Sequence, residues 1–290
     1  MSWRTVVVSS RAKLEMKLGY LVVRGDDTTR IHLSEISTLI VENTAVAVTA
    51  SLLSELSKRK IKVIFCDEKR NPCSELISYY GSHDTSLKIR NQTNWKKYTC
   101  QQVWTEIVSE KIRNQKRLLE YLDSKKSYLL DEYIRDIQFN DVSNREGHAS
   151  KVYFNEIFGM DFTRASDNNI NAALNYGYGI ILSAFNREIV ANGYVTQIGI
   201  SHDNIFNQFN LSSDLMEPFR PLIDRCVLDL NLEEFSKNQK ISLVNVLNEE
   251  VFIDSKKQYV NNAIRIYCRS IFDALNEDDI SQIRFFRNEL

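Results

Sequence analysis

The sequence is poor in the two residue types that break helices and shape tight turns: it has nine glycines and three prolines among 290 residues. Because both are costly inside a helix, their scarcity favours a helix-rich body. The five cysteines are scattered, odd in number and form no CxxC pair, which argues against a zinc ribbon and against a disulfide framework. Reduced thiols are typical of the cytoplasm, and we expect the protein to act there.

Long hydrophobic runs are also missing. No stretch approaches the roughly 18 apolar residues that a membrane-spanning helix needs. The first residues, MSWRTVVVSS, lack a basic start followed by a long apolar segment, so we expect no signal peptide and no membrane anchor. The formal net charge is only -1 at pH 7. Any binding of nucleic acid must therefore depend on local basic patches.

The hydrophobic period changes once along the chain. The first 82 residues contain short runs rich in β-branched residues, such as TVVV, KLEMKLGYLVVRG, TLIVEN and IKVIFCD, and such runs predict strands. Within this region, AVAVTASLLSELSKRK has the spacing of one helix. Further on, apolar residues recur at three- and four-residue steps, as at Trp104, Val108 and Ile112. We predict an α+β protein with two domains, a small β-rich domain (1–82) and a larger all-α domain (83–290).

Three acids interrupt a segment that otherwise has the pattern of an apolar helix, SDLMEPFRPLIDRCVLDL. At about 100° per residue, Asp214, Glu217 and Asp224 fall on one face. Such an acidic stripe is usually a solvated face, and acids also suit the first turn of a helix. A structural role and a ligand role both stay open for these residues.

Glu146 allows two interpretations as well. In the segment SNREGHASKVYFNEIFG it shares a helical face with Ala149 and Tyr153, and this face should be buried. Ser143 and Glu146 also fit the S-x-x-E capping box, in which the acid folds back onto the helix start. The residue is therefore either a cap or an inward-pointing ligand.

His202 follows the short apolar segment GYVTQIGIS. A glutamate on a buried stripe, a loop histidine and an acid near a helix start can converge on one divalent cation. Carboxylates with a single imidazole suit magnesium or manganese better than zinc. A site of this kind is typical of phosphodiester chemistry, because the metal makes a water or hydroxyl group nucleophilic.

Three blocks carry a resemblance to a known family: REGHASKVYFNEIFG, FTRASDNNINAALNYGYGIILSAF and GISHDNIFNQFNLSSDLMEPFRPLID. In content and order they resemble the signature blocks of the CRISPR-associated integrase, the catalytic subunit of spacer acquisition. The resemblance covers essentially the whole chain. The opening MSWRTVVVSS, the segment KIRNQ and the compact length are most similar to the variant found in type II-A systems.

The resemblance implies a metal-dependent DNA integrase and endonuclease. In this activity the 3′-hydroxyl of a short captured DNA attacks a phosphodiester of the CRISPR repeat array. The resemblance implies Glu146, His202 and Glu217 as catalytic metal ligands, with Mg²⁺ or Mn²⁺ as the cofactor. It makes Asp214 a possible accessory acid and assigns no role to Asp224.

The partners that the resemblance implies are double-stranded DNA, a second copy of the chain held through the β-rich domain, a small ferredoxin-like Cas subunit, the effector nuclease and a ring-shaped DNA-end-binding protein. Basic residues that could contact DNA, each of which could equally be solvated, are Arg164, Lys256, Lys257, Arg265 and Arg269. Two alternatives stay open. One is a metal-dependent nuclease of junction or repair type without integration, and the other is a catalytically silent DNA-binding scaffold.

Overall fold

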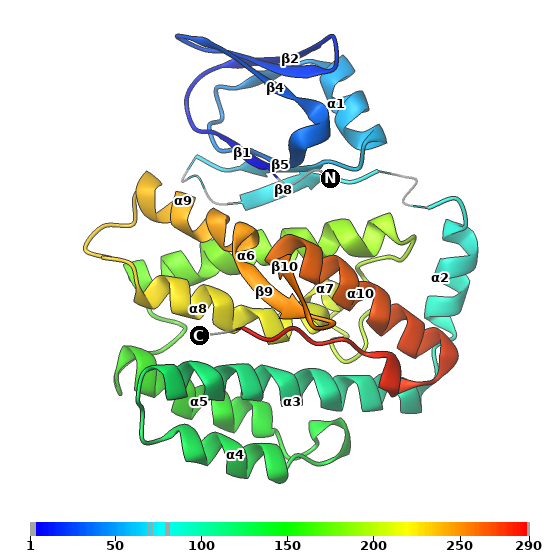
Figure 1. Ribbon diagram of the computed structural model, residues 1–290, viewed down its shortest axis with the longest axis vertical. Coiled ribbons are helices and arrows are strands. Elements are labelled where there is room, and N and C mark those ends of the chain that lie inside the picture. The colour runs from blue at the N-terminus through cyan, green and yellow to red at the C-terminus, as the bar shows by residue number, and fades with distance from the viewer. Residues whose placement is uncertain (1–3, 69, 71, 79–81, 289–290) are drawn as a thin grey trace. The chain divides into compact units, whose positions relative to one another are not determined.

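The computed structural model describes residues 4–68, 70, 72–78 and 82–288 (Figure 1). The chain divides into two compact units, Met1–His83 (unit 1) and Asp84–Leu290 (unit 2). Unit 1 is rich in strands and unit 2 is mainly helical, which confirms the predicted fold class. Across the described ranges, no helix is both long and apolar enough to cross a membrane.

In its described part, unit 1 contains two four-stranded sheets and one α-helix. The sheets have the strand orders β1-β5-β7-β8 and β4-β3-β2-β6. Their elements are β1 (Arg4–Val8), β2 (Lys13–Lys17), β3 (Tyr20–Arg24), β4 (Thr28–His32), η1 (Leu33–Glu35), β5 (Ile36–Val41), β6 (Ala47–Val48), α1 (Ala50–Lys58), β7 (Lys62–Cys66) and β8 (Pro72–Leu76).

Strand β5 lies at the centre of the first sheet. Its sequence ISTLIV is buried along its whole length, and it pairs in parallel with β1 and with β7, as expected of a strand covered on both faces. The helix predicted from AVAVTASLLSELSKRK begins later than expected, because Ala47 and Val48 pair with β2 instead. Thr49 is the N-cap of α1, and its side chain accepts a hydrogen bond from the amide of Leu52.

Unit 2 is built around two long helices, α3 and α6. Helix α6 contacts α7, α8, α9 and α10, whereas α3 contacts α4, α5, α8 and η3. The elements are α2 (Thr85–Thr93), α3 (Lys97–Tyr121), α4 (Ser127–Arg135), η2 (Phe139–Asp141), α5 (Arg145–Phe158), α6 (Asn169–Ala191), α7 (Asn210–Met216), η3 (Glu217–Phe219), α8 (Arg220–Leu228), α9 (Lys237–Asn245), η4 (Val246–Asn248), β9 (Glu250–Ile253), β10 (Lys256–Tyr259), α10 (Val260–Glu277) and η5 (Ile280–Gln282).

The prediction that this region is all-α misses one hairpin. Strands β9 and β10 pair antiparallel, and Asp254 and Ser255 connect them with positive φ angles of 51° and 59°. Two consecutive residues in this left-handed region form the turn that best matches the twist of a hairpin. The strands are short and carry charged residues, so the hydrophobic period alone does not reveal them.

The single helix predicted across the three acids is broken into α7, η3 and α8. The break coincides with Pro218 and Pro221, which have no amide hydrogen to donate to a preceding turn. The helix is therefore interrupted at Pro218. As a result, Asp214, Glu217 and Asp224 lie on three consecutive elements.

Candidate metal centre

The three acids are buried, with exposed fractions of 0% for Asp214, 3% for Glu217 and 1% for Asp224. Their interpretation as a solvated face is therefore wrong. A buried carboxylate is strongly unfavourable unless charges or hydrogen-bond donors surround it. The partners of each acid accordingly define the centre.

Glu146, at the start of α5, is not a capping residue. Asn144, rather than Ser143, is the N-cap of this helix, and its side chain accepts a hydrogen bond from the amide of Gly147 at 3.3 Å. Asp141 accepts the amide hydrogen of Glu146 itself at 3.0 Å. Because other side chains satisfy the helix start, the Glu146 carboxylate is available to turn inward.

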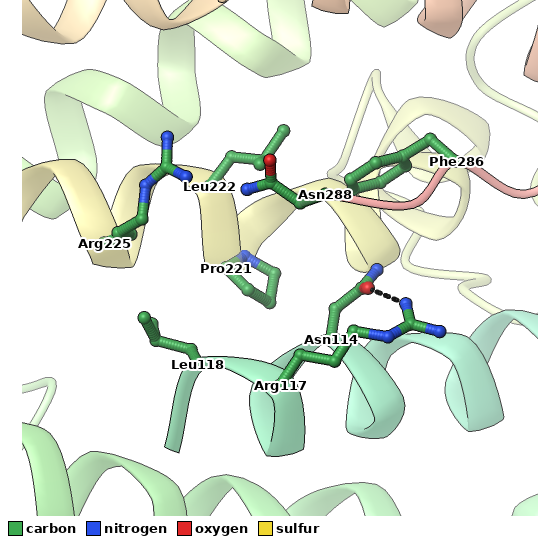
Figure 2. Close-up of a pocket in the computed structure, with 8 residues that line it drawn as sticks. All are labelled: Asn114, Arg117, Leu118, Pro221, Leu222, Arg225, Phe286 and Asn288. Atoms are coloured by element: carbon green, nitrogen blue, oxygen red, sulfur yellow. Dashed lines mark hydrogen bonds between the residues drawn. The ribbon is translucent and has the colours of Figure 1, made fainter. Parts of the chain in front are cut away.

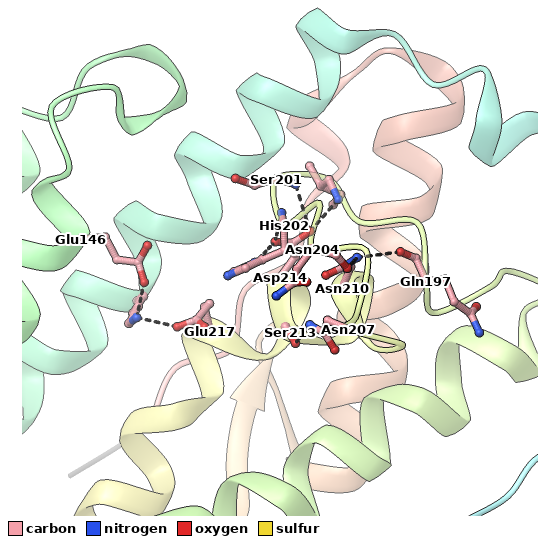
Figure 3. Close-up of polar contacts among 12 residues, drawn as sticks. Glu146, Gln197, Ser201, His202, Asn204, Asn207, Asn210, Ser213, Asp214 and Glu217 are labelled. Carbon is pink, nitrogen blue, oxygen red and sulfur yellow. Dashed lines mark hydrogen bonds and ion pairs between the residues drawn. The ribbon is translucent and has the colours of Figure 1, made fainter. Parts of the chain in front are cut away.

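A single lysine joins Glu146 to Glu217. The Nζ atom of Lys111, on α3, lies 2.5 Å from Oε1 of Glu146 and 2.5 Å from Oε2 of Glu217. Figure 3 shows the two carboxylates facing the same side-chain nitrogen. A second cation, Arg220, lies with Nη2 2.9 Å from Oε1 of Glu217. The two acids thus share one buried cation, and Glu217 has another of its own.

These ion pairs keep both the Glu217 carboxyl group and the Lys111 amino group in their charged forms. Burial raises the pKa of the Glu217 carboxyl, but Arg220 and Lys111 outweigh that effect and hold the pKa below its ordinary value. Burial likewise lowers the pKa of Lys111, but Glu217 and Glu146 outweigh it and leave the pKa above its ordinary value. Lys111 and Glu217 are therefore both charged at neutral pH.

The short helix η3 is fixed from two sides. The side-chain amide of Asn114, one turn after Lys111 on α3, donates a hydrogen bond to the carbonyl oxygen of Pro218 at 2.9 Å. Phe219 packs against Phe185 and Phe286, with ring centroids 5.3 Å and 4.3 Å away. This packing holds Glu217 in place while its carboxylate faces the lysine.

His202 lies in the loop before α7, and Asp214 holds both its ring and the loop backbone by hydrogen bonds. Nδ1 of the ring is 2.5 Å from Oδ1 of Asp214. The same carboxylate accepts the backbone amides of Ile200 at 2.6 Å, Ser201 at 3.0 Å and His202 at 3.1 Å. The hydrogen bond to Asp214 raises the pKa of His202 above its ordinary value, although partial burial works against it. Asp214 therefore supports the histidine loop in this structure (Figure 3).

The loop is held at further points. The side-chain amide of Asn210 donates to the carbonyl oxygens of Gln197 and Asn204, both at 3.0 Å. Gly199 leaves no room for a larger residue, because a Cβ atom there would lie 2.3 Å from the carbonyl oxygen of His202. The position of the histidine is thus built into the loop.

The donors suit a divalent cation in their chemistry. The space between Glu146 and Glu217 favours positive charge, since the ammonium group of Lys111 already lies there. Oε2 of Glu217 makes this ion pair but no well-directed hydrogen bond. His202 uses Nδ1 for a carboxylate, which leaves Nε2 for a ligand, as is usual for metal-binding histidines.

The three predicted ligands are not gathered around one point. Within the part of the chain that the structure describes, no three His, Cys, Asp or Glu side chains lie close enough together to hold a metal ion. The carboxylates of Glu146 and Glu217 are brought together by Lys111, whereas His202 is held separately by Asp214. The residue types therefore fit a metal site, and a lysine stands between two of its candidate ligands.

Among the five candidate DNA-binding residues, Arg164 is linked to this cluster. Its guanidinium group lies 5.3 Å from the centre of the Tyr178 ring, and that of Arg220 lies 5.0 Å from the same centre. The other four residues belong to β10 and α10, where Arg265 and Arg269 are one helical turn apart. They are Lys256, Lys257, Arg265 and Arg269.

Two charged residues of the centre, Lys111 and Arg220, have no assigned role in the sequence interpretation. A signal for Lys111 was present: it follows Trp104 by about two turns, on the predicted apolar stripe of α3. A lysine at a buried helical position is rare unless it is paired. That position therefore predicts an acidic partner but does not reveal which acids provide it.

A separate hollow lies between α3, α8 and the last described residues (Figure 2). Its volume is about 20 Å³, room for about one water molecule. None of the buried acids lines it, so it is not a substrate site. The lining residues are Asn114, Arg117, Leu118, Pro221, Leu222, Arg225, Phe286 and Asn288.

Comparisons with a family model and with a known relative identify the same family. A family model described as CRISPR associated protein Cas1 matches residues 5–250. The CRISPR-associated endonuclease Cas1 of Neisseria meningitidis serogroup C (strain 8013) is 31% identical over 264 residues, which cover 88% of this chain and 86% of the relative.

Two solved structures share the fold. A casposase bound to an integration product has a TM-score of 0.77 and 16% identity, and the match covers 96% of this chain and 92% of that one. A Cas6-RT-Cas1–Cas2 complex has a TM-score of 0.75 and 18% identity, and the match covers 99% of this chain and 36% of that one.

Proposed function

The chain belongs to the Cas1 family of CRISPR-associated proteins, and we propose that it is a metal-dependent DNA integrase and endonuclease that inserts short captured DNA into a CRISPR repeat array. One observation carries the proposal: Glu146 and Glu217, from distant parts of the chain, share one buried cation. Burying Glu217 and drawing the partly buried Glu146 onto the same positive charge is unfavourable as a purely structural device. It is suited to a centre that handles anionic phosphate through a cation.

Glu146, His202 and Glu217 would hold Mg²⁺ or Mn²⁺. When bound, the metal would draw negative charge from the phosphoryl oxygen and activate the attacking hydroxyl group. The protein supplies the geometry. Asp214 holds Nδ1 of the His202 ring, so that Nε2 points away from Asp214. Arg220 orients the Glu217 carboxylate. No covalent enzyme intermediate is needed, so no serine or tyrosine nucleophile is invoked.

Double-stranded DNA would reach the centre over basic side chains. Arg164 is the first candidate, because it is close to the centre. Its guanidinium group and that of Arg220 lie against the same Tyr178 ring, and Arg220 pairs with Glu217. The pair Arg265 and Arg269 on α10 would extend the contact with the phosphate backbone, together with Lys256 and Lys257.

The protein partners follow from the family. The structural neighbour solved as a Cas6-RT-Cas1–Cas2 complex supports a small ferredoxin-like Cas subunit as one partner. The effector nuclease and a DNA-end-binding protein are further partners that the type II-A resemblance implies. A second copy would join through unit 1, whose sheets end in the edge strands β1, β8, β4 and β6, since exposed edges tend to pair. A chain beginning at Ser86 should then sediment as a monomer, and a dimer would contradict this.

The test is strand transfer into a plasmid that carries a repeat array, with Mg²⁺ or Mn²⁺ present. Glu146→Ala, His202→Ala and Glu217→Ala should each abolish cleavage and joining while circular dichroism shows an intact fold. Glu132→Ala and His83→Ala alter exposed residues of the same types and should leave activity unchanged. Activity within about tenfold of wild type, a loss of less than about 1.4 kcal/mol, would remove that residue from the site.

The same assay separates the alternatives. Cleavage without any joined product would favour a nuclease of junction or repair type. DNA binding with neither cleavage nor joining would favour a silent scaffold. The scaffold alternative treats the acids as caps and solvated faces, which is at odds with their burial and with the capping of α5 by Asn144.

A further inference from the structure

Two links join α5 to the continuous segment formed by η3 and α8: the Lys111 contact described above, and a second one about two turns further along. Glu146 and Tyr153 lie on one face of α5, about two turns apart, and Glu217 and Asp224 are separated by a similar length in η3 and α8. Lys111 joins the two glutamates, and the hydroxyl group of Tyr153 donates a hydrogen bond to Oδ2 of Asp224 at 2.9 Å. The two segments are thus tied at two levels about 10 Å apart.

Helix α6 contributes to the second level. The hydroxyl group of Tyr178 donates a hydrogen bond to Oδ1 of Asp224, so each carboxylate oxygen has its own tyrosine. The preceding residue, Gly177, allows α6 to approach α8 closely, because a Cβ atom there would lie 2.5 Å from a methyl group of Ile223. Arg220 packs over the Tyr178 ring and pairs with Glu217, so the two levels are also connected through side chains of α8 and η3.

The second level is isolated from water. Tyr153 is 0% exposed, Asp224 is 1% exposed and Tyr178 is 8% exposed. Burial raises the pKa of Asp224 to about 6, although the two tyrosine hydroxyl groups oppose this. The carboxylate is thus mainly ionised at neutral pH, and a buried ionised group with two donors resists any change in its geometry. An acid at this position is costly, and packing alone does not require it.

We propose that Asp224 is a positioning residue that sets the separation of Glu146 and Glu217 by tying α5 and α6 to α8. The inference rests on the proposed function, because it gives these glutamates the role of metal ligands. Asp224 does not itself contact the metal or the substrate. Its action runs through the two tyrosine hydrogen bonds, so removing either Asp224 or its Tyr153 partner should loosen the same pair of ligands.

The experiment measures Mn²⁺ affinity of the full chain by electron paramagnetic resonance of the free ion. Asp224→Asn and Tyr153→Phe nearly preserve side-chain size and should each weaken Mn²⁺ binding roughly tenfold, the low end of the range found for residues that hydrogen-bond a metal ligand directly. The double variant should lose no more than Asp224→Asn alone, because both changes act on the one hydrogen bond that Tyr153 and Asp224 share. Tyr153→Phe carries the test if Asp224→Asn fails to fold.

The control is Tyr176→Phe. It removes a buried tyrosine hydroxyl group from the same helix α6, from a ring that lies against Phe235 and Lys240 instead of Asp224. Its Mn²⁺ affinity should stay within about twofold of wild type, less than 0.5 kcal/mol. Equal weakening by Tyr176→Phe, or unchanged affinity in both Asp224→Asn and Tyr153→Phe, would overturn the proposal.

Amide hydrogen exchange without metal provides a second readout. Asp224→Asn should speed exchange in α5 roughly threefold or more while leaving α9 unchanged. If the wild-type protein bound no Mn²⁺, the proposed metal role would be contradicted. Faster exchange of α5 in Asp224→Asn would still support the link that Asp224 makes between α5 and α8. Unchanged exchange in α5 would overturn the tie whatever the metal result.

Discussion

The Nζ atom of Lys111 lies 2.5 Å from Oε2 of Glu217, where both side chains are almost fully buried. An ammonium group at this place and a divalent cation would compete for the same carboxylate oxygens. The lysine therefore acts as a built-in counter-ion, and its removal should have an effect opposite in sign to the removal of a ligand.

We expect Lys111→Met to raise Mn²⁺ affinity by roughly tenfold or more, because the metal no longer has to displace a charge. Without metal the same variant should be less stable by at most about 3–5 kcal/mol, since the buried Glu217 keeps only Arg220 and the partly exposed Glu146 loses its lysine. Titration calorimetry and thermal unfolding with and without Mn²⁺ measure both effects. Lys116→Met, on the same helix but paired with Glu120 and Asp131, is the control. Unchanged or weaker Mn²⁺ binding in Lys111→Met would show that the lysine does not compete.

The pH below which activity falls should depend on the concentration of the metal ion. Asp214 raises the pKa of His202 above its ordinary value, which is about 6.5, and only the neutral ring can bind a metal. At limiting metal, activity should therefore already fall as the pH drops below neutrality, and added Mg²⁺ or Mn²⁺ should move the fall to lower pH. Strand-transfer rates at several pH values and metal concentrations measure this shift. A fall that stays at the same pH over a hundredfold range of metal would mean that His202 is not a titrating ligand.

The same pKa shift affects stability with a definite sign. A histidine whose pKa is higher in the folded state stabilises the fold fully below its unfolded value of about 6.5. That contribution is lost as the pH rises through the raised folded value. Acid loss of activity near neutrality would thus accompany a more stable histidine loop, which distinguishes it from acid unfolding.

Gly199→Ala should displace the histidine loop. The added Cβ atom would lie 2.3 Å from the carbonyl oxygen of His202 and 2.7 Å from Oδ2 of Asp214, so one of these groups must move. A displacement of about 1 Å at a reacting centre can cost on the order of 10²-fold in rate. We expect a loss of that size, with the His202 ring titrating closer to its ordinary pKa by NMR. Gly25→Ala, where the nearest atom is at 3.5 Å, should leave both unchanged, and normal activity in Gly199→Ala would contradict the rigid loop.

Reversing the charge of Lys256, Lys257, Arg265 and Arg269 together should weaken DNA binding and flatten its dependence on salt. Each basic side chain that no longer neutralises a phosphate lowers the slope of log affinity against log salt by about 0.9. Fluorescence anisotropy of labelled duplex DNA between about 50 and 200 mM salt measures the change. Over this range a protein with roughly 6–10 phosphate contacts loses about 10³- to 10⁵-fold in affinity. Lys58→Glu, an exposed lysine of unit 1, is the control. An unchanged slope would place the DNA elsewhere.

The sequence predicts most clearly the features that repeat along one helix. The face shared by Glu146, Ala149 and Tyr153 is such a feature, because the helical period alone places these residues together. The buried stripe of α3 belongs to the same class. The hairpin β9–β10 could not be predicted in this way, since its short strands carry little hydrophobic pattern.

Contacts between distant segments are harder to foresee. Lys111 meets Glu146 and Glu217 only because α3, α5 and η3 pack together, and no local pattern pairs them. The burial of Asp214 and Asp224 depends on backbone amides and tyrosines from other elements. A stripe of acids looks the same in the sequence whether water or protein surrounds it, so its solvated interpretation could be corrected only by the structure.

The ammonium group of Lys111 also bears on how the protein matures. Small zinc domains stay unfolded until their metal arrives, because metal binding supplies the free energy that folds them. Here the repulsion between Glu146 and Glu217 is neutralised by a residue of the chain itself. With the metal role proposed above, a newly synthesised molecule would complete its fold first and bind its ion later, and a chelator should stop its activity without denaturing it.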